Sequence, residues 1–255
     1  MNQQGSDFQG KVVLITGGTR GIGKALSLRL ASEGAHVAMN YLSRTNEAEQ
    51  ALQELESAGG QGAIVAGDVS TPESAAEIVA RAREQLGPID MLVTAAGISI
   101  PGSADDMTWE RWKTTHNINL DGTFSMIYAV KDEMIERGFG RIVTFSSIAG
   151  LRERENQIAY SSSKAAVIAM TRCMAQAWAG VNLRVNCVCP GLTETEMAHT
   201  LSDEVHKVII GATPLGRIGV PEEIAAVARF LLSEESSFMT GQTIVASGGS
   251  VMLPG

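Results

Sequence analysis

The 255-residue chain lacks an excess of basic residues: 20 Lys and Arg stand against 28 Asp and Glu, and its formal net charge is −8. This balance provides no electrostatic footprint for nucleic acid or an anionic membrane surface. No run of 18 apolar residues occurs, and the first residues lack the basic and apolar segments of a signal peptide. We therefore expect a cytoplasmic protein that binds a small molecule, without nucleic acid or membrane as a partner.

Cysteine and histidine are also scarce. The three cysteines, Cys173, Cys187 and Cys189, form no C-x-x-C pair, and the four histidines show no spacing of metal ligands. We therefore predict neither a disulfide framework nor a metal site. Cys187 and Cys189 lie two residues apart in an apparent strand, so both are expected to pack on one face of a sheet.

Short, continuously apolar segments alternate with helical patterns along the chain. Continuous rather than alternating apolar residues predict strands buried on both faces, as in a parallel sheet. The segments cover 11–17, 36–41, 62–69, 90–97, 141–147, 184–191 and 241–247. With 44% hydrophobic residues and no repeat or linker, the chain is predicted to form a single α/β domain over residues 1–255. The predicted fold is Rossmann-type and doubly wound, with about seven parallel strands and helices on both faces.

Three helix starts are recognisable between these segments. Thr71 is followed by Pro72, Thr108 precedes Trp109, and Pro221 opens an apolar, helix-forming run. Threonine is a favourable N-cap residue, and proline is tolerated in the first helical turn because its missing N–H group has no partner there. In such a fold, ligands bind beyond the carboxyl ends of the strands, where the motifs described next are found.

A glycine-rich loop, TGGTRGIGK (16–24), joins the first predicted strand to the first predicted helix. Glycines allow positive φ angles and a close approach of the backbone to a pyrophosphate, and the helix N-terminus offers free N–H groups and a positive dipole end. In this context the loop predicts dinucleotide binding. The contacting residues are expected to be Gly17, Thr19, Arg20, Gly21, Ile22 and Gly23.

The same loop sequence also matches most of a second motif, the phosphate loop of kinases and NTPases. Gly18, Gly23 and Lys24 fit it, but Ala25 stands where a Ser or Thr hydroxyl would hold magnesium. A phosphate-loop enzyme is therefore an alternative that lacks its metal anchor.

The end of the second predicted strand indicates which dinucleotide binds. A fold that prefers NAD usually has a carboxylate there for the ribose 2′-hydroxyl. This chain instead has Tyr41, Ser43 and Arg44, with no acid to repel a 2′-phosphate, and Arg20 and Arg44 are able to bind one. We predict NADP(H) as the cofactor; the alternative is that both arginines are simply solvated.

Asp68 and Val69 follow the third predicted strand at the same edge. Asp68 is placed to accept a hydrogen bond from the adenine amino group. Alternatively, its carboxylate caps the turn ahead of Thr71.

Four polar residues later in the chain form a candidate proton-handling group. Tyr160 and Lys164 are four residues apart in a run of helix-compatible residues, a spacing that stacks the two side chains on one helix face. Ser147 ends the predicted strand at 141–147, at the carboxyl edge. Asn119 lies inside a predicted long helix, where an amide is a poor helix former and would ordinarily face water.

Together, TGGTRGIG, NINL, the strand end at Ser147, YSSSK and CPGLTET resemble the short-chain dehydrogenase/reductase family, in order and across nearly the whole chain. Within that family the pattern is most similar to bacterial 3-oxoacyl-acyl-carrier-protein reductases. The resemblance implies reduction of a carbonyl to a secondary alcohol. Alternatives are an alcohol dehydrogenase working in the oxidative direction and a non-catalytic NADP-binding sensor or partner protein.

The resemblance also implies a role for each polar residue. Tyr160 would donate the proton to the alkoxide, and Lys164 with the oxidised nicotinamide would lower the phenol's pKa from about 10. Ser147 would hydrogen-bond the carbonyl oxygen, and Lys164 would also bind the ribose hydroxyls. Asn119 would position a water that links Lys164 to solvent.

Further cofactor contacts follow from the same resemblance. Pro190 and Gly191 turn the chain after the sixth strand, and Thr193 and Thr195 follow where the family contacts the nicotinamide carboxamide; alternatively, either threonine caps the next helix. The fourth strand ends in Thr94-Ala95-Ala96-Gly97 where the family usually has one or two asparagines. Ala95, Ala96 and Gly97 still permit a close backbone approach to the cofactor ribose.

The resemblance divides the chain into a cofactor half (about 8–150), a catalytic helix and substrate lid (about 151–216), and a C-terminal helix and strand (about 217–255). The lid segment, 192–216, has an apolar side formed by Met197, Leu201, Val205, Val208 and Ile209; alternatively, these residues pack on the core. The substrate is expected to be a small carbonyl compound, free or carrier-bound. Arg137, Arg141, Arg152 and Arg154 are candidates for a basic carrier dock, and a homotetramer is the expected assembly.

Overall fold

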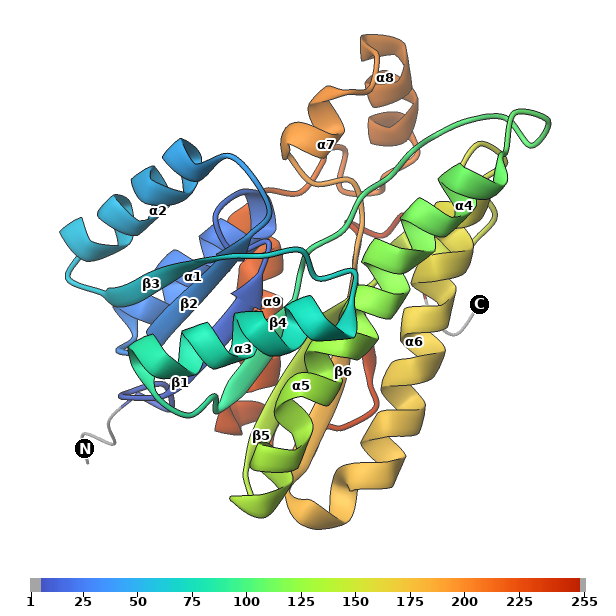
Figure 1. The fold of residues 1–255 in the computed structure, drawn as a ribbon. Helices are drawn as coiled ribbons and strands as arrows, with labels where there is room; N and C mark the ends of the chain where they lie inside the picture. Colours follow the sequence, from blue (N-terminus) through green and yellow to red (C-terminus); the bar gives the residue numbers. More distant parts are fainter. Residues whose placement is uncertain (1–5, 253–255) are drawn as a thin grey trace.

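The computed structural model describes residues 6–252, and its strands form one seven-stranded parallel sheet (Figure 1). The sheet order is β3-β2-β1-β4-β5-β6-β7. The strands are β1 (Val12–Thr16), β2 (His36–Tyr41), β3 (Gln61–Ala66), β4 (Met91–Thr94), β5 (Gly140–Phe145), β6 (Leu183–Pro190) and β7 (Thr243–Ala246). The prediction of a parallel, Rossmann-type sheet is confirmed. The strand order reverses between β1 and β4, which makes that boundary the place where ligands bind in such sheets.

Helices cover both faces of the sheet (Figure 1). One face is covered by α1 (Gly21–Ser32), α2 (Thr45–Ser57) and α9 (Pro221–Leu232), and the other by α3 (Pro72–Leu86), α5 (Gly122–Glu136) and α6 (Ile158–Trp178). The shorter elements are α4 (Trp109–His116), α7 (Glu196–His199), α8 (Asp203–Gly211), a π-helical turn at Asn117–Asp121, and 3₁₀ turns at Ile148–Gly150, Ala179–Val181 and Glu234–Ser236.

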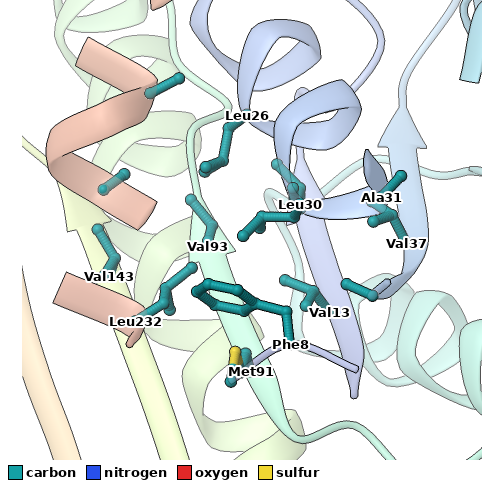
Figure 2. Packing of buried hydrophobic residues seen from close by; sticks show 14 of the residues in the cluster. Phe8, Val13, Leu26, Leu30, Ala31, Val37, Met91, Val93, Val143 and Leu232 are labelled. Atoms are coloured by element: carbon teal, nitrogen blue, oxygen red, sulfur yellow. The ribbon is translucent and has the colours of Figure 1, made fainter. Parts of the chain in front are cut away.

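The core consists of two main apolar layers, one on each side of the sheet. Successive residues of β1 point to opposite layers, so that Val13 lies in the cluster under α1 and α9 whereas Leu14 lies in the cluster under α3 and α5. Phe8 packs in the first cluster with Leu30 of α1 and Leu232 of α9 (Figure 2). Full burial of side chains of this size contributes about 1.5–3 kcal/mol each.

Local signals place the helix starts as predicted. The Thr71 hydroxyl accepts a hydrogen bond from the backbone N–H of Ser74 (3.3 Å), and the Thr108 hydroxyl accepts one from Arg111 (3.2 Å). Pro221 is the first residue of α9. Each start depends on residues within one turn, which is why the sequence alone was sufficient to identify it.

The buried cysteines have the packing role expected of them. Cys187 and Cys189 are both fully buried in β6 and lie in one cluster with Val167 and Ile168 of α6. Within residues 6–252, no helix is long and apolar enough to cross a membrane.

Candidate active site

The glycine loop forms a tight backbone cradle between β1 and α1. Gly17 has φ +63°, and a Cβ added at Gly23 would lie 2.1 Å from the carbonyl oxygen of Gly17, so no side chain fits there. The Ser27 hydroxyl donates to the carbonyl oxygen of Gly18 at 3.0 Å and holds the loop on its helix. The free N–H groups at the start of α1 therefore lie beside a backbone surface without side chains, which suits the pyrophosphate of a dinucleotide.

The segment after β4 lies against this cradle. The backbone N–H of Ala96 donates to the Thr16 hydroxyl at 3.1 Å, which ties the segment to the end of β1. A Cβ added at Gly97 would lie 3.1 Å from Asn119 Oδ1 and 3.4 Å from Lys164 Nζ. Gly97 therefore allows the backbone to run directly beside Asn119 and Lys164. Ala95, two residues before Gly97, is half-buried.

Asn119 lies in the π-helical turn between α4 and α5, a kind of turn that often marks a functional position. It is fully buried instead of facing water. Its Oδ1 accepts from the backbone N–H of Ile98 (2.9 Å), and its Nδ2 donates to the Ile98 carbonyl (3.0 Å) and to Ser163 Oγ (3.1 Å). The amide thus clamps the segment after β4 to α6, and its implied role in holding a water stays a prediction.

Tyr160 and Lys164 share one face of α6, as the sequence spacing predicts. Lys164 Nζ lies 5.8 Å from the centroid of the Tyr160 ring and donates to the carbonyl oxygen of Phe145 at 2.9 Å. Ser147 follows the end of β5; its hydroxyl accepts from the backbone N–H of Ala149 at 3.1 Å and lies close enough to Tyr160 to lower the pKa of that phenol. The Ser146 hydroxyl donates to the carbonyl oxygen of Lys164 at 2.7 Å and fixes α6 against the strand. The structure therefore brings all four predicted polar residues to one place.

Burial shifts the pKa values of Tyr160 and Lys164 in opposite directions. Burial raises the pKa of Tyr160, and the nearby Ser147 hydroxyl offsets only part of that increase. Burial also lowers the pKa of Lys164 to about 8. The expected depression of the Tyr160 pKa is therefore not a property of the folded chain alone, because the cost of desolvating the phenolate dominates.

The arginines expected to bind a 2′-phosphate lie close together but are not simply solvated. Arg44 caps α2 with a left-handed backbone (φ +67°), and its Nη1 lies 3.0 Å from a Glu196 oxygen and 3.0 Å from Glu47. Arg20 Nη1 lies 2.6 Å from the same Glu196 carboxylate. The prediction that no acid is available here to repel a 2′-phosphate is thus wrong. Glu196 lies 152 residues after Arg44 and 176 residues after Arg20, and no sequence signal connects it to either arginine.

The residues expected near the adenine ring follow β2 and β3 at the carboxyl edge of the sheet. The Asp68 carboxylate accepts from the backbone N–H of Ser70 at 2.9 Å, the turn-capping alternative, while the carboxylate stays exposed. Val69 is buried. Sequence reasoning missed Asn40, whose buried amide donates to the Gly67 carbonyl at 3.1 Å and fixes the chain after β3. Tyr41, the last residue of β2, is half-buried, and Ser43 is exposed.

The segment after β6 returns to the glycine loop. Pro190 is the last residue of β6, and the Thr193 hydroxyl donates to the carbonyl oxygen of Gly191 at 3.1 Å. Thr195 occupies the N-cap position of α7, but its hydroxyl donates to the Thr193 carbonyl (3.3 Å) and does not cap the helix. The Thr195 methyl group lies beside Gly21, 3.3 Å from the position of an added Cβ.

The predicted lid forms α7 and α8, which stand away from the sheet (Figure 1). Met197, Val205 and Val208 are 45%, 42% and 71% exposed, so the alternative that they pack on the core is wrong. Leu201 and Ile209 are half-buried. The segment therefore presents apolar side chains on its surface, and their role in covering a substrate stays a prediction.

Two of the four candidate docking arginines lie at the edge of the sheet opposite the glycine loop. Arg137 pairs with Asp90 (2.9 Å) and Arg141 with Glu234 (2.9 Å), both at the amino ends of the strands. By contrast, residues 152–157 lie at the carboxyl edge, beside 99–102: the Gly102 N–H donates to the Asn156 carbonyl at 3.0 Å. Arg152 and Arg154 lie in this segment and are half-buried, and Arg152 donates to the Ser250 carbonyl oxygen at 3.2 Å, so their use as a dock stays a prediction.

Comparison with known proteins gives a consistent result. The sequence model of the family described as "Enoyl-(Acyl carrier protein) reductase" matches residues 17–250. The chain is 40% identical to an acetoacetyl-CoA reductase of Shinella zoogloeoides, covering 94% of this chain and 98% of that protein. It is also 40% identical to the 3-oxoacyl-acyl-carrier-protein reductase FabG of Thermotoga maritima, covering 96% and 99%.

A solved structure with the same arrangement is the 3-oxoacyl-acyl-carrier-protein reductase of Brucella melitensis, which is 34% identical with a TM-score of 0.89 and covers 96% of this chain and 92% of that one. The parallel sheet, the glycine cradle and the Ser147, Tyr160 and Lys164 cluster agree with these likenesses. The chain belongs to the short-chain dehydrogenase/reductase family of oxidoreductases.

Proposed function

We propose that this protein reduces the ketone of a 3-oxoacyl thioester to a secondary alcohol, with NADPH as cofactor. The observation that carries the proposal is the cluster around Tyr160: Lys164 Nζ lies 5.8 Å from the tyrosine ring, and Ser147 lies close enough to the phenol to lower its pKa. The names of the relatives, acetoacetyl-CoA reductase and 3-oxoacyl-acyl-carrier-protein reductase, support this class of substrate.

The cofactor fits the residues present. The glycine cradle would hold the pyrophosphate at the N-terminus of α1, Arg20 and Arg44 would bind the 2′-phosphate, and Lys164 would bind the ribose hydroxyls. When bound, NADPH supplies the hydride for the carbonyl carbon. At Gly97 the backbone runs directly beside Asn119 Oδ1 and Lys164 Nζ, and the ribose would lie against this edge.

The protein's own groups handle the proton. Ser147 and Tyr160 would hydrogen-bond the ketone oxygen, and Tyr160 would donate its proton as that oxygen gains negative charge. Burial raises the pKa of Tyr160, which keeps the phenol protonated before reaction. Burial lowers the pKa of Lys164 to about 8, close to working pH, so its ammonium group is suited to stabilise the phenolate and return a proton.

The first test is the initial rate of NADPH oxidation with acetoacetyl-CoA, comparing wild type with Tyr160→Phe. We expect the variant to bind NADPH and to lose turnover by at least about a hundredfold, the lower range of a general acid's contribution. A variant within threefold of wild type would remove Tyr160 from the chemistry. Crotonyl-CoA, an enoyl thioester, is the matched substrate control, and we expect no NADPH oxidation with it.

The second test concerns the cofactor. Arg44→Ala should weaken NADPH binding by about tenfold, because a charge-assisted contact to phosphate is lost, and leave NADH binding unchanged. Fluorescence titration of both cofactors measures this directly. Equal affinities for NADPH and NADH in wild type, unchanged by the substitution, would overturn the choice of NADPH.

The proposed assembly is a homotetramer. Trp109, Phe124 and Tyr128 of α4 and α5 are 69%, 41% and 45% exposed, and the rings of Phe124 and Tyr128 stack with centroids 4.1 Å apart. Large apolar side chains gathered on one outer face are typical of a subunit contact. Light scattering should therefore give about four times the 26.9 kDa chain mass.

A further inference from the structure

The Glu196 carboxylate joins two arginines that come from separate parts of the cofactor edge. Its oxygens lie 2.6 Å from Arg20 Nη1, in the glycine loop, and 3.0 Å from Arg44 Nη1, at the start of α2. All three side chains are about half exposed, so they are accessible to a ligand. The Glu196 carboxylate therefore already pairs with the two guanidinium groups that the proposed function assigns to the 2′-phosphate.

A carboxylate and a phosphate cannot both use this pair without a conflict. They accept hydrogen bonds from the same guanidinium groups, and two anions placed within a few ångströms repel each other. A phosphate monoester carries close to two negative charges at neutral pH, so it is the stronger competitor for arginine. A cofactor with a free 2′-hydroxyl brings no such charge and leaves the carboxylate undisturbed.

Glu196 also belongs to the lid. It is the first residue of α7, whose neighbour α8 has no buried residue. The base of the lid is attached to the body through the Thr193–Gly219 bridge and the contact of Thr195 with Gly21. The ion pairs of Glu196 therefore tie the start of α7 to the cofactor edge, whereas Glu47, the other partner of Arg44, lies on the same helix as the arginine and ties nothing to the lid.

We propose that Glu196 is a specificity-determining residue that senses the 2′-phosphate: a 2′-phosphorylated adenine nucleotide displaces its carboxylate from Arg20 and Arg44 and thereby detaches α7, whereas a nucleotide without that phosphate does not. The inference rests on the proposed use of NADPH. It means that cofactor choice and lid position are set by the same pair of arginines.

The test uses nucleotides that lack the nicotinamide, so that binding is measured apart from turnover. Titration calorimetry compares adenosine 2′,5′-bisphosphate with 5′-AMP on wild type and on Glu196→Gln. We expect the variant to bind the bisphosphate about three- to tenfold more tightly, the range for releasing two exposed ion pairs, and to bind 5′-AMP as wild type does. Glu194→Gln is the matched control, since Glu194 is an exposed lid carboxylate two residues away, and both affinities should be unchanged.

Hydrogen exchange over residues 195–211 gives the second readout. In wild type, the bisphosphate should speed exchange in this segment and 5′-AMP should not; in Glu196→Gln, exchange should be fast from the start and insensitive to either nucleotide. The inference is overturned if Glu196→Gln leaves the affinity for the bisphosphate unchanged or raises the affinity for both nucleotides equally. It is also overturned if hydrogen exchange in the variant still responds to the bisphosphate. If wild type binds both nucleotides equally well, the assignment of the 2′-phosphate site itself fails.

Discussion

Lys164 should make the stability of the protein depend on pH. Its side chain is 5% exposed, and its ammonium group donates to the carbonyl oxygen of Phe145 at 2.9 Å. Burial lowers its pKa from 10.5 to about 8. A difference of this size corresponds to about 3 kcal/mol between the two protonation states.

The direction of this pH dependence follows from whether the folded or the unfolded chain binds the Lys164 proton more tightly. Between pH 8 and 10.5 the unfolded chain keeps the Lys164 proton while the folded chain releases it, so the free energy of unfolding rises with pH. Below pH 8 both states are protonated, and the full cost of burying the charge remains. Lys164→Met removes this cost. Relative to the variant, wild type should gain about 2–3 kcal/mol of stability between pH 7 and pH 10.

Urea unfolding at pH 7 and pH 10, followed by circular dichroism, measures the difference. Lys207→Met is the control, because Lys207 is exposed on α8 and its ammonium group stays in water on folding. We expect its stability relative to wild type to be the same at both pH values. If the difference between wild type and Lys164→Met changes by less than about 0.5 kcal/mol, Lys164 is not desolvated in the way its burial implies.

Three further substitutions test the framework of the site. Gly23→Ala should abolish nucleotide binding in calorimetry, because its Cβ would lie 2.1 Å from the Gly17 carbonyl oxygen; binding within twofold of wild type would contradict the cradle. Asn119→Ala should lower the free energy of unfolding by about 2–4 kcal/mol in urea, since it leaves both backbone groups of Ile98 unpaired in the fold. Thr71→Ala should cost about 1 kcal/mol in the same assay through loss of its N-cap, and a loss below about 0.3 kcal/mol would argue against the cap.

The sheet and the helix starts could be predicted from the sequence because their signals are local. Strands buried on both faces need apolar residues at consecutive positions, and all seven such runs form strands, although the edge strands β3 and β7 are only partly buried. The N-caps at Thr71 and Thr108 depend on a backbone N–H three residues away. The shared helix face of Tyr160 and Lys164 follows in the same way from helical geometry.

Other features depend on groups that only the folded chain brings together. Nothing near Asn119 in the sequence indicates that its amide clamps Ile98, because the pairing needs the π-helical turn and the segment after β4 to meet. The raised pKa of Tyr160 is likewise an effect of burial by the surrounding structure.

The sequence by itself determined the order of strands and helices, the glycine cradle and the tyrosine–lysine pair, since each depends on contacts within a few residues. Tertiary structure alone decided that Glu196 meets Arg20 and Arg44, and that burial shifts the acidity of Tyr160 and Lys164. The physical reason is that electrostatic interactions depend on the distance between charges and on their solvation, and neither quantity can be read from separation along the chain.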